Sequence, residues 1–280
     1  MMGSCYRGIA LIFLAGTCLR GEVDWDLCVV HGDYDSLRRQ QDEETWMAWA
    51  KEAAAAVEGY YPLERENFQV IAIDGGAGSG KTTTARALAE RCGFAFVSTG
   101  EHYRLLTHFF LKENISARLS DAVEKRLRSL RPTTIFQGNR AHLSLDGRLV
   151  SDRELRRPEI NDAVPDYAAI PAVRKFLHAY ERELPLAALS AGFRGIVAEG
   201  RDVTGTVFPD AILRVCLMAD LDERARRRAR EGVRDDVADR DRRDSEQMQL
   251  PEGIWCIDST HLSLEEVVEL LRQRLEDLRP

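Results

Sequence analysis

The chain has 280 residues, of which 44% are hydrophobic and 30% are charged. That composition is globular and excludes collagen-like and wholly disordered chains. The formal net charge of −7 argues against a general nucleic-acid binder, which needs a basic face. Arginine outnumbers lysine 34 to 5, which fits an anionic ligand because arginine makes forked contacts to phosphate. Genome composition is the alternative source of that excess.

The first 66 residues differ from the rest and hold 12 acidic and 6 basic side chains. Residues 8–16 form an apolar run that resembles a secretory signal but is too short to span a membrane. Residues 43–58 have the composition of a helix, which Pro62 would end. We interpret 1–66 as an N-terminal extension of unknown role. A start site placed too far upstream is the alternative, with Met47 as the first residue.

Residues 67–280 alternate between strand and helix patterns. The apolar run 68–74 predicts a buried parallel strand. Further strands are expected at 94–98, 195–200, 211–219 and 254–258. Residues 133–137 and 141–147 have the pattern of two short strands or a hairpin. Helices are expected at 81–92 (ended by Gly93), 101–111, 121–130, 171–188, 221–231, 236–248 and 262–278. This alternation predicts an α/β fold in which helices flank a parallel sheet, and the motif described next makes it a fold of the P-loop type.

A glycine-rich segment between the first strand and its helix matches the pattern GxxxxGK[ST] in full. Its residues are Gly75, Gly76, Ala77, Gly78, Ser79, Gly80, Lys81 and Thr82. Glycines let backbone N–H groups face phosphate oxygens, and the helix N-terminus adds partial positive charge. We expect Lys81 to reach the β- and γ-phosphates of ATP and the Thr82 hydroxyl to hold Mg²⁺. Thr83 is included in this site, with an exposed helix position as its alternative.

Several stretches beyond this loop resemble the bacterial cytidylate kinases, which phosphorylate CMP and dCMP. They are residues 71–104, 196–228, 240–245 and 257–271. The most specific of them is EGRDVTGTVFPDA, at 199–211. The resemblance implies one kinase-like domain over 67–280, with a nucleotide-binding insert at about 115–175 and an arginine-rich lid at about 224–248.

The same resemblance implies an acceptor site. The expected catalytic residues are Lys81 of the phosphate loop together with Arg201 and Arg240, which the resemblance implies. The substrate-binding residues of the acceptor site would be Thr99, Arg104, Arg174, Arg201, Asp202, Arg240 and Asp244. Arg174 would read cytosine, Asp202 would orient Arg201 or the nucleotide, and Asp244 would meet the ribose. Alternatives are an exposed helix charge for Arg104 and a purely structural pair for Arg201 and Asp202.

The sequence departs from the family pattern at two polar positions. Pro165 stands where the family has a base-contacting serine, and Gln247 replaces an arginine. The expected reaction is phosphoryl transfer from ATP to CMP or dCMP, with Mg²⁺. The alternatives are another P-loop kinase of the uridylate or shikimate type, or a nucleotide-binding module without turnover. We expect a cytoplasmic monomer that binds neither a nucleic-acid polymer nor a membrane.

Overall fold

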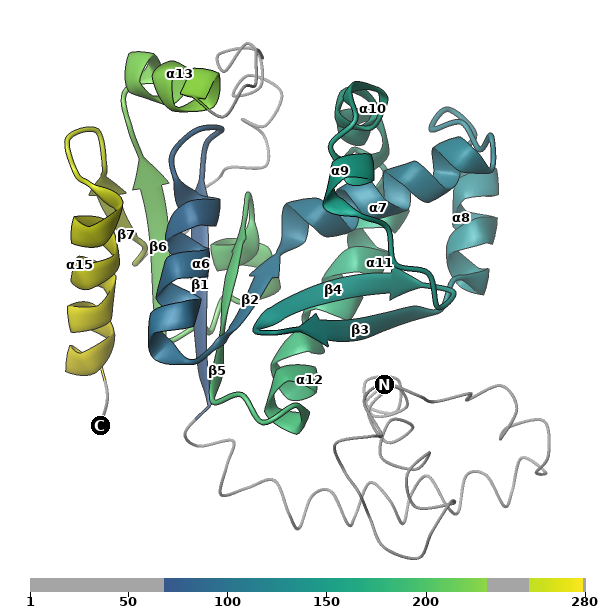
Figure 1. The fold of residues 1–280 in the computed structure, drawn as a ribbon. Coiled ribbons are helices and arrows are strands. Elements are labelled where there is room, and N and C mark those ends of the chain that lie inside the picture. The colour runs from purple at the N-terminus through teal and green to yellow at the C-terminus, as the bar shows by residue number, and fades with distance from the viewer. Residues whose placement is uncertain (1–67, 231–251, 279–280) are drawn as a thin grey trace, which may run out of the picture.

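The computed structural model describes residues 68–230 and 252–278, which form a sheet with helices packed against it (Figure 1). Three predictions lie outside the described residues: the extension 1–66, the helix at 236–248 and the sites at Arg240 and Asp244. Nothing in the structure tests them.

Seven strands of the described residues join in one sheet of order β3-β4-β2-β5-β1-β6-β7. They are β1 (Gln69–Gly75), β2 (Ala95–Ser98), β3 (Pro132–Gln137), β4 (Arg140–Leu145), β5 (Gly195–Gly200), β6 (Leu213–Met218) and β7 (Trp255–Asp258). Neighbouring strands are parallel except β3 and β4, which pair antiparallel. The predicted α/β fold is therefore confirmed, and the predicted hairpin is an edge of the sheet.

The helices mostly follow the predicted ranges. They are α6 (Lys81–Cys92), α7 (Thr99–Lys112), α8 (Ser120–Ser129), α9 (Asp152–Leu155), α10 (Pro158–Ala168), α11 (Pro171–Glu181), α12 (Leu184–Ser190), α13 (Leu221–Arg230) and α15 (Leu264–Asp277). Gly93 ends α6 as predicted, with φ at +66°, a backbone conformation that favours glycine. The helices α9 and α10 and the π-helical turn η1 (Val203–Val207) were not predicted.

The prediction of one helix over 171–188 is wrong. The chain leaves the helix at Arg182 and Glu183 and starts α12 with Pro185 in its first turn. Proline has no N–H to donate, and its ring would clash with the carbonyl of Glu181 four residues earlier in a continuous helix. The break therefore has a local cause.

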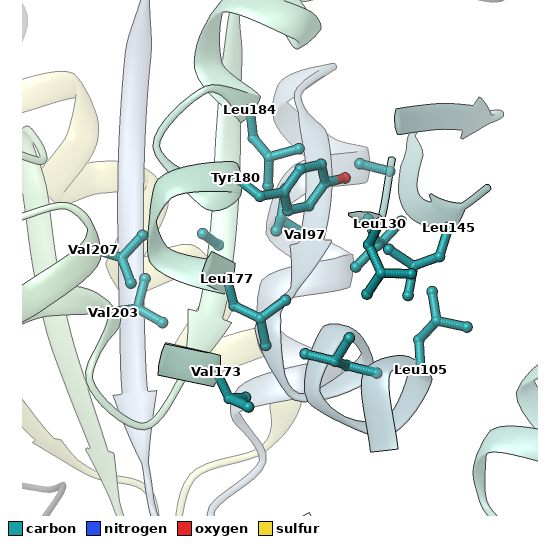
Figure 2. Packing of buried hydrophobic residues seen from close by; sticks show 14 of the residues in the cluster. Val97, Leu105, Leu130, Leu145, Val173, Leu177, Tyr180, Leu184, Val203 and Val207 are labelled. Carbon is teal, nitrogen blue, oxygen red and sulfur yellow. The ribbon is translucent and has the colours of Figure 1, made fainter. Parts of the chain in front are cut away.

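Alternate residues of the central strands face two separate cores. Ile71 and Ile73 of β1 join the side chains of α6 and α15 on one face, whereas Ala72 between them faces the other core. That second core contains Leu105 of α7 and Leu177 of α11 (Figure 2). Strands covered on both faces read as continuous apolar runs, which explains why the sequence pattern located them.

The region predicted as the insert packs on the second core. Leu127 of α8 and Leu143 of β4 lie in the same buried cluster as Val97 of β2. The insert's boundaries and its role stay a prediction. Within the described ranges, no helix is both long and apolar enough to cross a membrane.

Candidate functional site

The carboxyl ends of the parallel strands carry most of the predicted site residues. The segment Gly75–Thr82 follows β1, Thr99 follows β2, and Arg201 and Asp202 follow β5. Parallel strands end at the same edge of a sheet, so these segments meet there.

The Gly75–Thr82 loop has a backbone that only glycine tolerates at several points. Gly78 and Gly80 adopt φ values of +73° and +89°, in the region that favours glycine. A Cβ on Gly75 would lie 2.5 Å from the carbonyl oxygen of Leu217. The buried Ser79 Oγ has no hydrogen-bond partner among the described residues. The loop is therefore closely packed around its glycines and keeps the Ser79 hydroxyl without a partner among the described residues, which fits a phosphate-binding site.

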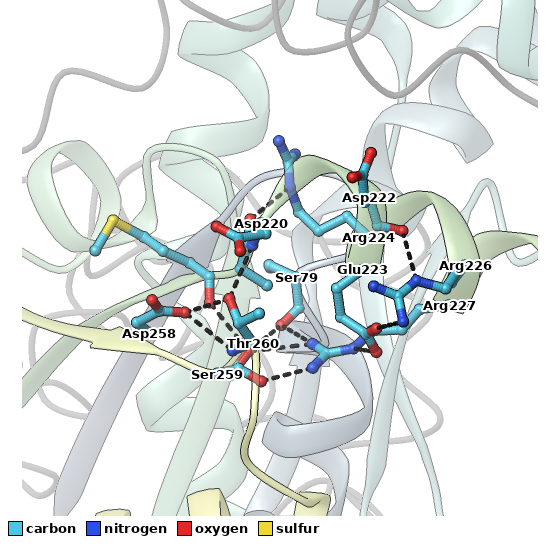
Figure 3. A network of polar contacts seen from close by, with 12 residues as sticks. Ser79, Asp220, Asp222, Glu223, Arg224, Arg226, Arg227, Asp258, Ser259 and Thr260 are labelled. Carbon is cyan, nitrogen blue, oxygen red and sulfur yellow. Dashed lines mark hydrogen bonds and ion pairs between the residues drawn. The ribbon is translucent and has the colours of Figure 1, made fainter.

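The helix α13 lies over this loop and places arginines beside it (Figure 3). Arg224 Nη1 donates to the Ala77 carbonyl at 3.3 Å, and Arg227 Nη1 to the Ser79 carbonyl at 3.4 Å. Arg227 Nη2 also donates to the Ser259 carbonyl at 2.6 Å. These guanidinium groups add positive charge next to Lys81, whose Nζ donates to the Gly76 carbonyl at 3.3 Å. Arg227 also pairs with Glu223 at 3.1 Å, so part of this charge is neutralised, but these three cationic side chains still border the loop.

Glu199, at the end of β5, is a site residue that the sequence analysis missed. Its Oε1 accepts hydrogen bonds from Thr82 Oγ1 at 3.1 Å and from Ser98 Oγ at 2.6 Å, and the residue is 3% exposed. The available signal was an acidic residue inside an otherwise apolar strand. Carboxylate and hydroxyl oxygens are hard ligands of the type Mg²⁺ prefers, so Thr82 and Glu199 fit a magnesium site. Thr83, by contrast, is exposed on α6.

Arg201 links the turn after β5 to the phosphate loop, since its Nη1 donates to the Gly75 carbonyl at 2.5 Å. Thr99 is buried, and its hydroxyl donates to the Glu199 carbonyl at 3.1 Å. Arg104 is partly buried, and its Nε donates to Asn161 Oδ1 of α10 at 3.1 Å. Arg104 is thus anchored between α7 and α10.

Asp202 pairs with Arg174 of α11, a partner that the sequence analysis did not foresee. Arg174 Nη2 donates to Asp202 Oδ2, and Nε2 of His178 lies 3.3 Å from the same oxygen. Burial alone would raise the pKa of the Asp202 carboxyl, but the contacts with His178 and Arg174 outweigh it and lower that pKa. Asp202 therefore carries its charge near neutral pH, between two nitrogen donors of one helix.

A second carboxyl, Asp74, holds the turn that carries Arg201 and Asp202. Its oxygens accept hydrogen bonds from the backbone N–H groups of Val203 and Thr204, both at 2.9 Å, and from Thr204 Oγ1 at 2.5 Å. Burial raises the pKa of Asp74 despite these bonds. Asp74 is the penultimate residue of β1, which leads into the phosphate loop, so this strand also holds the turn after β5.

Away from this edge of the sheet, one group of side chains consists of residue types that commonly bind metal ions. The ligand atoms of Glu101, His142 and Asp152 lie within 4.8 Å of one another. Arg140 already occupies the space between the two acids, at 2.5 Å from Glu101 and 2.8 Å from Asp152. That guanidinium neutralises the carboxylates, so this group is a structural ion-pair cluster.

Two comparisons with solved structures give low scores. A protein titled "Crystal structure of TT1252 from Thermus thermophilus" is 23% identical with a TM-score of 0.41, over 76% of this chain and 100% of that one. A shikimate kinase from Acinetobacter baumannii is 15% identical with a TM-score of 0.34, over 76% and 95%. Such scores carry no functional argument.

Comparison by sequence is decisive. Cytidylate kinase of Caldanaerobacter subterraneus subsp. tengcongensis is 38% identical over 71% of this chain and 91% of that protein. Cytidylate kinase of Thermosipho melanesiensis is 36% identical over 71% and 93%. The family model described as cytidylate kinase matches residues 71–277, from the phosphate loop to the last helix. This chain belongs to the cytidylate kinase family.

Proposed function

We propose that this enzyme transfers the γ-phosphoryl group of ATP to CMP or dCMP and releases CDP or dCDP. The observation that carries the proposal is the family match over residues 71–277, which includes both the phosphate loop and the turn with Arg201 and Asp202. The alternatives from the sequence, a uridylate- or shikimate-type kinase and a binding module without turnover, are not favoured by that match.

The donor nucleotide is assigned to the loop Gly75–Thr82. Its N–H groups and Lys81 would bind the β- and γ-phosphates of ATP. Thr82 would hold Mg²⁺, and Glu199 would fix the Thr82 hydroxyl, which donates to it at 3.1 Å. Bound Mg²⁺ supplies positive charge that neutralises the phosphate oxygens. Thr83 stays a prediction for this site.

The acceptor is assigned to the residues around Asp202. Its phosphate is already anionic near neutral pH, so no general base is needed to create a nucleophile. The protein's contribution is then positioning and charge neutralisation. Arg201 donates to the Gly75 carbonyl at 2.5 Å, which keeps its guanidinium beside the phosphate loop, and it would bind phosphate oxygens there. Thr99, Arg104, Arg174 and Asp202 would bind the acceptor, as would Arg240 and Asp244 beyond the described residues.

Initial rates with a panel of acceptors test the proposal. The full-length protein, with ATP and Mg²⁺, should phosphorylate CMP or dCMP faster than UMP, AMP or shikimate. A clear preference for one of the other acceptors would overturn it, and so would a lack of turnover with every acceptor. The same panel measures the ratio of the rates with CMP and dCMP.

The setting of the enzyme is a separate part of the proposal. ATP and nucleoside monophosphates are cytosolic metabolites, so we place the enzyme in the cytoplasm. We further propose that it acts as a monomer on small nucleotides, without a nucleic-acid polymer or a membrane as partner. Size-exclusion chromatography with light scattering of the full-length protein tests the monomer directly.

A further inference from the structure

The helix α11 borders a groove of about 650 Å³ next to the turn after β5. Arg174, His178 and Arg182 of α11 line it, together with Thr206 of η1. Arg174 and His178 are four residues apart, so they stand on the same face of the helix. Arg182 donates to the backbone carbonyls of Thr206 and Val207 and so links α11 to η1. Lys175 also lines the groove, but Arg174 and His178 are the lining side chains that contact Asp202.

Both of these side chains contact one oxygen of Asp202. Arg174 Nη2 donates to Oδ2, and His178 Nε2 lies 3.3 Å from the same atom. The hydroxyl oxygen of Tyr103, on α7, lies 3.4 Å from His178 Nε2. The other carboxylate oxygen, Oδ1, has no hydrogen-bond partner in the part of the chain that the structure describes. Asp202 is thus fixed through one oxygen while the second stays available to a ligand.

One position at which the family has a polar side chain carries a proline in this chain. Pro165, which stands where the family has a base-contacting serine, lies inside α10 and is partly buried. It offers neither a hydroxyl nor an N–H, so α10 loses a polar group at that position. Asn161, one turn earlier on α10, is already bonded to Arg104. Two polar side chains of the neighbouring helix α11, Arg174 and His178, do reach the site, where both contact Asp202.

We propose that His178 is a positioning residue of the acceptor site, which holds the Asp202 carboxylate so that Asp202 and Arg174 meet the bound monophosphate in fixed orientation. This inference rests on the proposed function. His178 Nε2 must carry a proton to donate to Asp202 Oδ2. With that donor in place, two nitrogen donors instead of one hold the carboxylate.

Steady-state kinetics of two substitutions test the proposal. His178→Leu removes the donor, whereas His178→Gln places an N–H donor at about the same reach as Nε2. We expect His178→Leu to raise the KM for CMP at least about fivefold, as the loss of a hydrogen bond to a charged group predicts. The KM for ATP and kcat should stay within about twofold, and His178→Gln should restore the KM for CMP. An unchanged KM for CMP in His178→Leu, or equal effects of both substitutions, overturns the proposal.

A matched control is His108→Leu, which replaces a buried histidine of α7 that lies 3.6 Å from Glu154. It should leave both KM values unchanged. If His178→Leu does not fold, ¹⁵N spectra of the wild-type imidazoles decide instead, with His178→Gln for assignment. A protonated Nε2 that shifts on addition of CMP supports the proposal, and an unprotonated Nε2 overturns it.

The outcomes separate this inference from the proposed function. If the wild-type protein does not phosphorylate CMP, the proposed function fails. If it phosphorylates CMP normally and His178→Leu does so with the same KM, only the role of His178 fails.

Discussion

The proposed donor and acceptor halves of the site are built in different ways. The donor half is one continuous segment, Gly75–Thr82, whose shape comes from glycine backbone conformations. The acceptor half gathers side chains from α7, α10, α11 and the turn after β5, such as Arg104, Arg174 and Asp202. A backbone site depends on local sequence, whereas a side-chain site depends on how helices dock. Substitutions should therefore separate the two halves kinetically.

The largest effect is expected on the donor half, from Lys81→Met. The substitution keeps the length of the side chain but removes the charge beside the phosphate loop. We expect kcat to fall by about 10²–10³-fold or more, because a fixed positive charge meets the transferred phosphoryl group. Initial rates at saturating ATP and CMP measure it.

The matched control for this change is Lys112→Met, at the exposed end of α7, where the lysine pairs with Glu154 at 3.1 Å. It should retain full activity. Wild-type turnover in a folded Lys81→Met enzyme would remove the donor half from the proposed mechanism.

A smaller effect confined to the acceptor is expected from Asp202→Asn. Asparagine keeps the shape but loses the charge that pairs with Arg174 and His178. We expect the KM for CMP to rise by about tenfold, whereas the KM for ATP stays within about twofold. Asp277→Asn, at the exposed end of α15, is the control. Equal changes in both KM values would show that the two halves are not independent.

The same contrast explains what the sequence could predict. The loop and its flanking strand were predictable because the motif and the buried β1 are contiguous in the chain. Arg174 and Asp202 were both predicted as acceptor residues, but not their ion pair, which joins residues 28 positions apart. Such a pair depends on how α11 packs against the turn after β5, and residue spacing does not encode that.

Glu199 and the break before α12 show two further limits. Glu199 lies in a strand whose apolar neighbours mark it as core, so its role at Thr82 emerges only when β1 and β5 pair. The break between α11 and α12 was predictable from the sequence, because Pro185 is incompatible with a continuous helix that runs through Glu181. The predicted helix over 171–188 took no account of that proline.

The smallest effect is expected on stability, where α11 joins α12. Burial raises the pKa of Glu183 from its ordinary value of 4.5 to about 7. The folded state therefore holds a proton that the unfolded state has released between these pH values. It follows that the contribution of Glu183 to the free energy of unfolding falls as pH rises from about 4.5 to 7.

Glu183→Gln cannot lose this proton, so it should gain stability over the wild type as pH rises. We expect a gain of about 1 kcal/mol at pH 8 relative to pH 5, measured by urea unfolding at both pH values. Glu90→Gln, exposed near the C-terminal end of α6, should shift stability equally at both pH values. A gain of the same size in Glu90→Gln would assign the effect to net charge. No gain in Glu183→Gln would show that the Glu183 carboxyl is solvated in the folded state and that burial does not raise its pKa.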